Sequence, residues 1–134
     1  MQTTSSREHP DPVVETQIQR TLAPYTRIAS PAMLATMRER LETFMQRYEM
    51  IGDIRGRGQL IGVELVRDRA SKTPATEEGK AIGRMCFERG LIFSLRREGS
   101  VLRFVPPATT TPGQIDWAMD RLGEALEAAS TGAA

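Results

Sequence analysis

Arg103 is the residue whose type and position most directly suggest chemistry. It lies in the middle of the segment Val101–Val105, which alternates as a β-strand does, so its guanidinium shares a face with the two terminal valines. A charged group among apolar neighbours is costly unless it is paired, and the planar fork of arginine matches a carboxylate. The spacing leaves two interpretations open: a salt bridge to Glu64 on a neighbouring strand, or a site for the carboxylate of a ligand.

Few other residues suggest nucleophilic or metal chemistry. His9, the only histidine, lies in a polar N-terminal segment, and Cys86, the only cysteine, falls on the apolar face of a predicted helix. A Ser-His-Asp or Cys-His arrangement within this chain would need His9. No group of cysteine, histidine and carboxylate residues has the spacing of a zinc site. We therefore expect structural roles for both residues and no metal centre of this kind.

Two further features have a structural and a functional interpretation. The run Ile54–Gly58 (IRGRG) is not a phosphate loop, because no Gly-Lys-Ser/Thr follows it and no helix begins there. We expect it to form a tight entry into the next strand, with glycines where the backbone needs freedom. Trp117 falls opposite the apolar face of the last predicted helix. It is either an exposed aromatic or part of a contact with a missing domain or a second subunit.

Composition excludes several classes of protein. The 134 residues, 40% hydrophobic and 26% charged, suit one soluble domain. The apolar runs are far shorter than the ~20 residues that cross a bilayer, and the N-terminus does not resemble a secretory signal. With 18 basic and 17 acidic residues, charge gives no reason to propose nucleic acid or a membrane surface as a partner. A single cysteine precludes an internal disulfide and favours a reducing, cytoplasmic location.

Periodicity predicts the elements that position these residues. Helices are expected at residues 12–22, 31–49, 77–89 and 112–129, and strands at residues 59–66, 91–95 and 101–105. The last two strands would form a hairpin, and the last helix begins with a capping box of Thr111 and Gln114. The order predicts an α/β (α+β) small domain, with a small, mostly antiparallel sheet and helices packed on one face.

The chain divides into three predicted parts. Residues 1–29 form an N-terminal tail and a linker helix, for which Asp11 is the expected N-cap. Residues 30–129 form the folded domain, and residues 130–134 are small or polar and form a loose tail.

The segment from residue 51 to residue 107 resembles the C-terminal part of class III pyridoxal-phosphate (PLP) aminotransferases. Residues 51–58 (IGDIRGRG) and 59–66 (QLIGVELV) are similar to the family signature of Ile-Gly-Asp, a hydrophobic residue, Arg-Gly-x-Gly and a later hydrophobic-Gly-hydrophobic-Glu. Residues 86–91 (CFERGL), 101–107 (VLRFVPP) and 111–116 (TPGQID) extend the similarity, which covers about residues 11–129. Within the family, the pattern is most similar to that of dialkylglycine decarboxylases, which are decarboxylating transaminases.

This resemblance implies part of a fold-type I PLP enzyme, usually a homodimer or a tetramer of dimers. Such enzymes move an amino group from an amino acid to a keto acid, and the C-terminal region builds most of their small domain. The family's arginine at the position of Arg103 binds the substrate carboxylate, so the resemblance favours the ligand site. Asp11 falls where dialkylglycine decarboxylase has an alkali-metal ligand. Arg7 falls where the family has a threonine that reaches the partner subunit's cofactor phosphate.

The resemblance also implies what this chain lacks. The Schiff-base lysine, the aspartate at the pyridine nitrogen and the ring-stacking aromatic belong to the family's large domain. Lys72 and Lys80 are the only lysines, and neither matches a cofactor motif. We therefore expect PLP to be bound mainly by a large domain outside this sequence, with no catalytic residue here. The alternative is a non-catalytic α+β binding or interaction module, or a truncated remnant that needs a separate large domain.

Overall fold

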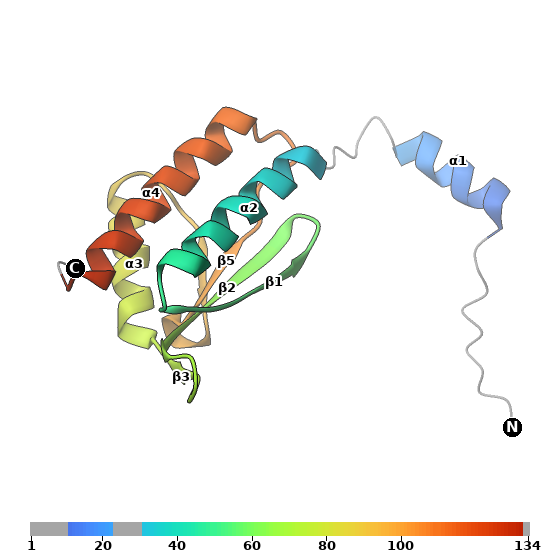
Figure 1. Ribbon diagram of the computed structural model, residues 1–134. Coiled ribbons are helices and arrows are strands. Elements are labelled where there is room, and N and C mark those ends of the chain that lie inside the picture. Colours follow the sequence, from blue (N-terminus) through green and yellow to red (C-terminus); the bar gives the residue numbers. More distant parts are fainter. Residues whose placement is uncertain (1–10, 23–30, 133–134) are drawn as a thin grey trace, which may run out of the picture.

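The computed structural model describes residues 11–22 and 31–132. Helices α2, α3 and α4 lie on one side of a twisted sheet (Figure 1). The elements are α1 (Pro12–Leu22), α2 (Pro31–Arg47), β1 (Ile51–Arg57), β2 (Leu60–Asp68), β3 (Thr73–Pro74), α3 (Thr76–Glu88), β4 (Ser94–Arg96), the 3₁₀ turn η1 (Arg97–Gly99), β5 (Val101–Phe104) and α4 (Pro112–Ser130). The predicted antiparallel sheet with helices on one face is confirmed.

The sheet is antiparallel throughout, in the order β1-β2-β5-β4, and β3 pairs with the end of β2. A loop of two residues, Gly58 and Gln59, joins β1 to β2. Gly58 has a φ of 55°, a left-handed conformation that glycine adopts without steric cost and that tight hairpins require. The predicted hairpin of β4 and β5 is also present.

The prediction for residues 54–58 was incomplete, because residues 54–57 form the second half of a full strand and only Gly58 lies in the turn. β1 runs from residue 51 to residue 57, and a register shift between Ile51 and Asp53 interrupts its alternation. Ile51 and Ile54 are therefore both buried although they are three residues apart. Gly56 has a φ of 149°, and a Cβ there would lie 1.9 Å from the carbonyl oxygen of Leu60. The expectation that these glycines provide backbone freedom is confirmed.

The core lies between the sheet and the three helices. Alternate residues of β2 and β5 point toward the helices, and the apolar stripes of α2, α3 and α4 meet them. The residues at this interface that are at most 7% exposed include Met37, Leu41, Ile61, Val63, Leu65, Ile82, Cys86, Leu102, Phe104, Ile115, Met119, Leu122 and Leu126. Each large apolar side chain buried in this way contributes about 1.5–3 kcal/mol.

The start of α4 follows its sequence signal closely. The backbone N–H of Gln114 donates to Thr111 Oγ1 at 3.2 Å, and the N–H of Thr111 donates to Gln114 Oε1 at 2.9 Å. Pro112 occupies the first turn, where its missing N–H is not needed. The predicted capping box is confirmed, and it fixes where α4 begins relative to the end of β5.

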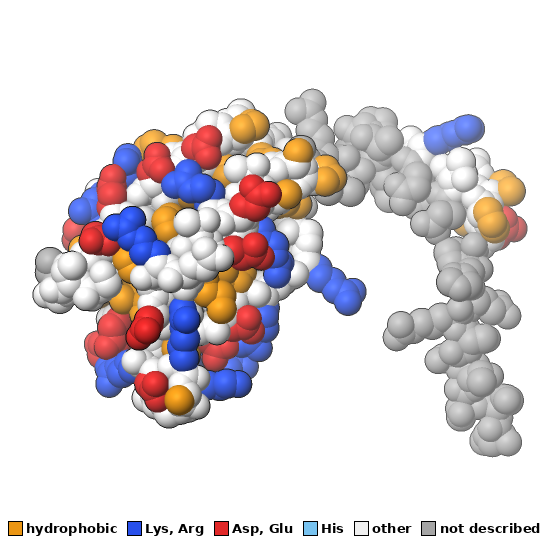
Figure 2. Space-filling model, viewed as in Figure 1, with side chains coloured by type: hydrophobic (Ala, Val, Ile, Leu, Met, Phe, Trp, Pro, Cys, Tyr) orange, Lys and Arg blue, Asp and Glu red, His pale blue; other side chains and the backbone are white. Residues whose placement is uncertain are grey.

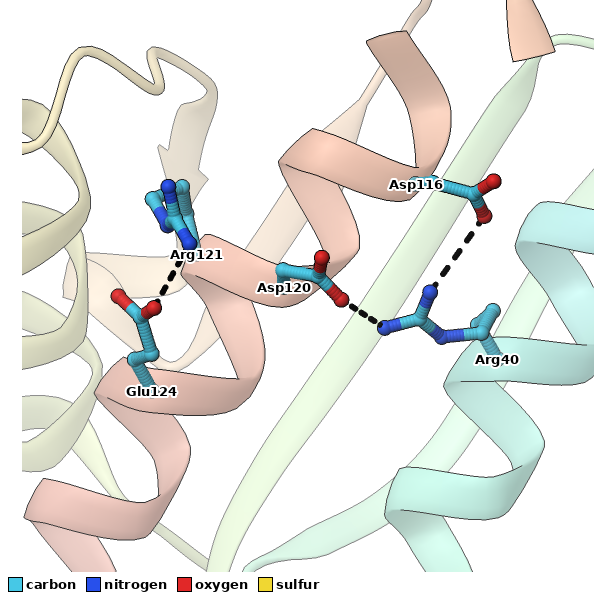
Figure 3. Close-up of polar contacts among 5 residues, drawn as sticks. All are labelled: Arg40, Asp116, Asp120, Arg121 and Glu124. Atoms are coloured by element: carbon cyan, nitrogen blue, oxygen red, sulfur yellow. Dashed lines mark hydrogen bonds and ion pairs between the residues drawn. The ribbon is translucent and has the colours of Figure 1, made fainter. Parts of the chain in front are cut away.

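Charged side chains join α4 to α2 at the surface. Arg40 of α2 reaches Asp116 at 3.4 Å and Asp120 at 2.7 Å on successive turns of α4 (Figure 3). On this side of the molecule, basic and acidic side chains are interspersed (Figure 2). Exposed pairs contribute only about 0–1 kcal/mol each. They therefore orient two helices that the apolar core holds together.

The other face of the sheet has no helix over it in the part of the chain that the structure describes. Its side chains come from the alternate positions of the strands, such as Glu64, Val101 and Arg103. Antiparallel sheets can leave one face to solvent. In the described residues, no helix is long and apolar enough to cross a membrane.

Candidate functional site

Arg103 lies on the open face of the sheet, at the centre of three strands. In the register, Gly62 of β2 is its partner on one side and Ser94 of β4 is its partner on the other. Its neighbours Leu102 and Phe104 point into the core and are 0% and 6% exposed. The predicted placement of Arg103 on a face with Val101 is thus confirmed, and its side chain is half-buried.

The guanidinium of Arg103 has unused hydrogen-bonding capacity. Its Nη2 donates to Ser94 Oγ at a long 3.4 Å, and its buried Nε has no hydrogen-bond partner in the described structure. No carboxylate of the described residues lies within ion-pair distance. Leaving a buried donor of a charged group unpaired costs more than leaving a neutral one, so this arrangement suits a ligand carboxylate.

The alternative salt bridge between Arg103 and Glu64 is not formed. Glu64 lies opposite Val101 on β5 and forms an ion pair with Arg55 of β1 on its other side. Arg55 also reaches Asp53 at 3.0 Å. The sequence alone did not reveal Arg55 as the competing partner, because β1 was not recognised as a strand beside β2.

A groove of about 390 Å³ extends from Arg103 past the edge of the sheet to the start of α4. We call it the Arg103 groove. Its lining is largely apolar and includes Leu91, Ile92, Phe93, Phe104, Val105, Pro106, Ile115 and Met119, with Ser94, Thr110 and Gln114 as polar members. The rings of Phe93 and Phe104 pack 4.7 Å apart. One cation in an apolar groove is a typical arrangement for binding a carboxylate that carries an apolar group.

The described part of the Arg103 groove has the hydroxyls of Ser94 and Thr110 but no stronger acid, base or nucleophile. None of its lining residues is a lysine, histidine, cysteine, tyrosine or carboxylate in the described structure. Lys80 lies elsewhere and pairs with Glu77 at 3.3 Å, and Lys72 lines a different hollow. The groove can thus hold and orient a ligand, but its own side chains supply no acid or base stronger than a hydroxyl.

The remaining candidate residues lie apart from this groove. Cys86 is fully buried, as predicted, and burial raises the pKa of its thiol to about 11. Asp11 caps α1 by accepting from the N–H of Val13 at 2.8 Å, and its proposed role as a metal ligand stays a prediction. Among the described residues, no three His, Cys, Asp or Glu side chains form a metal-binding group. His9 and Arg7 lie outside the described residues.

Trp117 is 42% exposed on α4. The guanidinium of Arg121 lies over its ring, 5.6 Å from the centroid, and covers part of the indole. The expected exposed aromatic is therefore present, while a contact with another domain or subunit stays a prediction.

Comparisons with known proteins identify relatives of this chain. It is 41% identical over 88 residues to a leucine/methionine racemase of Thermococcus litoralis, covering 66% of this chain and 20% of the racemase. It is 38% identical over 87 residues to the mitochondrial alanine–glyoxylate aminotransferase 2 homolog 2 of Arabidopsis thaliana, covering 64% and 18%. The chain thus spans about a fifth of the length of these relatives.

A solved structure supports the same relationship. The PMP-bound aminotransferase of Vibrio fluvialis matches 75% of this chain and 22% of its own, with a TM-score of 0.65 and 33% identity. The model of the family described as aminotransferase class III matches residues 27–126. The chain therefore belongs to the class III aminotransferase family, whose cofactor is pyridoxal phosphate.

Proposed function

We propose that this chain is the C-terminal, carboxylate-binding part of a PLP-dependent aminotransferase or decarboxylating transaminase. The observation that carries the proposal is the half-buried guanidinium of Arg103, which has an unpartnered Nε and no acidic partner in the described structure. Family membership supports an amino acid and a keto acid as substrates. Arg103 would bind the carboxylate through paired hydrogen bonds, and the apolar lining of the groove would orient the rest of the substrate and exclude water.

The cofactor would be held mainly by a large domain outside this sequence. PLP supplies the electron sink for chemistry at the amino-acid α-carbon. The residues present fit the substrate side of such a site, because the Arg103 groove offers a cation but no lysine. The chain matches only about a fifth of its relatives' length, which is consistent with a separate large domain.

The oligomeric state and the cellular location are also part of this proposal. We infer a homo-oligomer of the complete enzyme and a cytoplasmic location. The first rests on the family resemblance, and the second on the single, buried cysteine. The open face of the sheet, which contains Arg103, is the surface that a large domain would cover.

Carboxylate binding can be measured on the chain itself. We expect 4-methylpentanoate, a carboxylate with an apolar tail, to shift the Nε–H resonance of Arg103 in an NMR titration. The Arg103→Leu variant should lose this binding. Arg103→Lys should weaken it about three- to tenfold, because a point charge replaces a fork. Arg57→Leu, which removes an exposed arginine at the β1 hairpin, is the matched control and should bind like the original chain.

Two results would count against the proposal. Equal affinity of the original chain and Arg103→Leu would show that the guanidinium does not bind the carboxylate. Incubation with PLP followed by borohydride reduction should give no stoichiometric adduct on Lys72 or Lys80. An adduct accompanied by amino-acid turnover would show that the cofactor site lies within this chain.

A non-catalytic binding module is the second candidate function. It is favoured by the absence of lysine, histidine, cysteine, tyrosine and carboxylate side chains from the lining of the Arg103 groove in the described structure. The two candidates differ in their genetic context, because an aminotransferase requires a lysine-bearing large domain. Sequencing the DNA upstream would show whether the same or a neighbouring frame encodes such a domain.

A further inference from the structure

Besides the Arg103 groove, a polar hollow of about 300 Å³ lies on the open face of the sheet, near the turns that follow β2 and β4. Arg103 is not part of it. Its charged lining residues are Asp53, Arg55, Glu64, Arg69, Lys72 and Arg97. Four are basic and two are acidic, so the hollow carries an excess of two positive charges. The whole chain has a net charge of only +1, so this excess is local.

Two of the four cations are already engaged. Arg55 forms ion pairs with both carboxylates of the hollow, Asp53 at 3.0 Å and Glu64. Arg69 donates to three backbone carbonyls in and just after the last turn of α2, at residues 45, 48 and 49, over 2.6–3.3 Å. These arginines stabilise the β1–β2 pair and the helix end, and they leave the charge of the other two cations uncompensated.

Lys72 and Arg97 are the unengaged cations. Neither side chain has an ion pair or hydrogen bond with any described residue. They come from turns far apart in the sequence, the β2–β3 turn and η1, yet both line the same hollow. Two like charges held near each other repel, so this arrangement favours an anion between them.

The backbone at both positions is unfavourable for a long side chain. Lys72 has a φ of 55° and Arg97 a φ of 48°. With Glu98, they are the non-glycine residues of positive φ in the described structure. Glycine would occupy this region without steric cost, yet the sequence has the two cations. Strain of this kind concentrates at ligand sites.

Local hydrogen bonds hold the two turns in place. The carbonyl oxygen of Asp68 accepts from the N–H of Lys72 at 2.8 Å, and the Asp68 carboxylate accepts from the N–H of Ser71 at 2.9 Å. The carbonyl oxygen of Arg97 accepts from the N–H and the hydroxyl of Ser100, at 3.2 and 2.9 Å. Both cations therefore extend from ordered turns, which lowers the entropic cost of binding.

We propose that this polar hollow binds a small phosphate-bearing ligand between Lys72 and Arg97. A phosphate dianion matches the excess of two positive charges, and the arginine fork suits its oxygens while lysine supplies a point charge. Because both cations are exposed, the expected dissociation constant is on the order of 1 mM at low ionic strength. Salt should weaken the binding.

The test is an NMR titration of the full chain with inorganic phosphate and with glycerol phosphate, against sodium chloride at equal ionic strength. We expect amide shifts at residues 71–73 and 96–99. Lys72→Ala and Arg97→Ala should each weaken binding about two- to fivefold, and the double variant about tenfold. Arg96→Ala removes an adjacent cation that does not line the hollow and is the matched control. Arg103→Leu should also bind phosphate at the hollow normally.

A glycine substitution separates binding from folding. Lys72→Gly relieves the positive φ, so it should raise the melting temperature while it weakens phosphate binding as much as Lys72→Ala does. Binding of both compounds indicates a general phosphate site, and binding of glycerol phosphate alone indicates an organic phosphate ligand. The proposal is overturned if the Lys72–Arg97 double variant binds phosphate as the original chain does, if Arg96→Ala weakens binding equally, or if Lys72→Gly lowers the melting temperature.

Discussion

Burial has different consequences for two side chains of this protein, Cys86 and Arg103. Cys86 is fully enclosed, and the cost of burying a thiolate raises its pKa from 9.0 to about 11. The thiol therefore stays neutral near pH 7. The guanidinium of Arg103 is half-buried, and its Nε has no hydrogen-bond acceptor in the described structure. Burial makes the first residue unreactive, and the unpartnered Nε of the second supports the proposed carboxylate site.

The chemistry of Cys86 follows from its pKa. Because the folded value lies above the unfolded one, the thiol contributes stability that is fully present below about pH 9. This contribution is lost as the pH rises through about 11. We predict that Cys86 reacts with a thiol-disulfide reagent at pH 8 only as the chain unfolds, and rapidly in denaturant. Fast reaction in the folded chain would contradict the buried position.

Sequence reasoning at this scale predicted the face on which Arg103 lies, because alternation along β5 is a local property. It could not choose between Glu64 and a ligand as the partner of Arg103. That choice depends on the register of β2 against β5 and on β1, which provides Arg55 as the partner of Glu64. The hydrogen bond from Arg103 to Ser94 could not be predicted either, because it depends on the register of β4 against β5.

At the scale of elements, α3 and the turn before β5 approach unusually closely. A Cβ at Gly79 would lie 1.8 Å from the carbonyl oxygen of Gly99 and 3.3 Å from Leu65 Cδ1. Gly99 itself has a φ of 109°. The first turn of α3 can therefore pack on η1 only because residue 79 has no side chain. This contact positions the turn from which Arg97 extends.

We predict that Gly79→Ala destabilises the chain by roughly 2–4 kcal/mol, because backbone must move to make room. The matched control is Gly113→Ala in the first turn of α4, where a Cβ meets nothing within 4 Å. That change should stabilise the chain by up to about 1 kcal/mol, since alanine favours helix. Urea unfolding of both variants measures the difference, and equal stabilities would refute the close contact.

The elements with local signals were the predictable ones. The capping box of α4 and the end of the helix predicted at residues 77–89, which Gly90 follows with a φ of 88°, depend on residues adjacent in sequence. β1 was missed because its bulge places Ile51 and Ile54 on the buried side at a spacing that strands do not normally show. β3 is only two residues long and exists through its pairing with β2, so it lies in the segment between the predicted strand at residues 59–66 and the predicted helix at residues 77–89.

At the scale of the whole molecule, the folded body is built from residues 31–132. No contact joins α1 to another element within the described chain, and Val13 and Val14 on α1 are 71% and 50% exposed. The division into an N-terminal tail and linker helix at residues 1–29, a domain at 30–129 and a loose tail at 130–134 stays a prediction, although α4 continues to Ser130.

Deleting residues 1–29 tests this division. We predict that the shortened chain unfolds in urea with a stability within about 0.5 kcal/mol of the full chain, because the deletion removes no described packing contact. Circular dichroism and urea titration on both chains are sufficient. A loss above about 2 kcal/mol would show that the N-terminal segment is part of the folded core.

The order of the sheet also restricts how this protein can associate. One edge is β1, which ends in the exposed Arg55 and Arg57, and the other is the three-residue β4, which ends in Arg96. Short or positively charged edges oppose the addition of further strands. Strand-by-strand growth into extended aggregates is therefore disfavoured at both ends. Any dimer or larger complex should form through the helical surface or the open sheet face, each of which presents side chains for a partner to recognise.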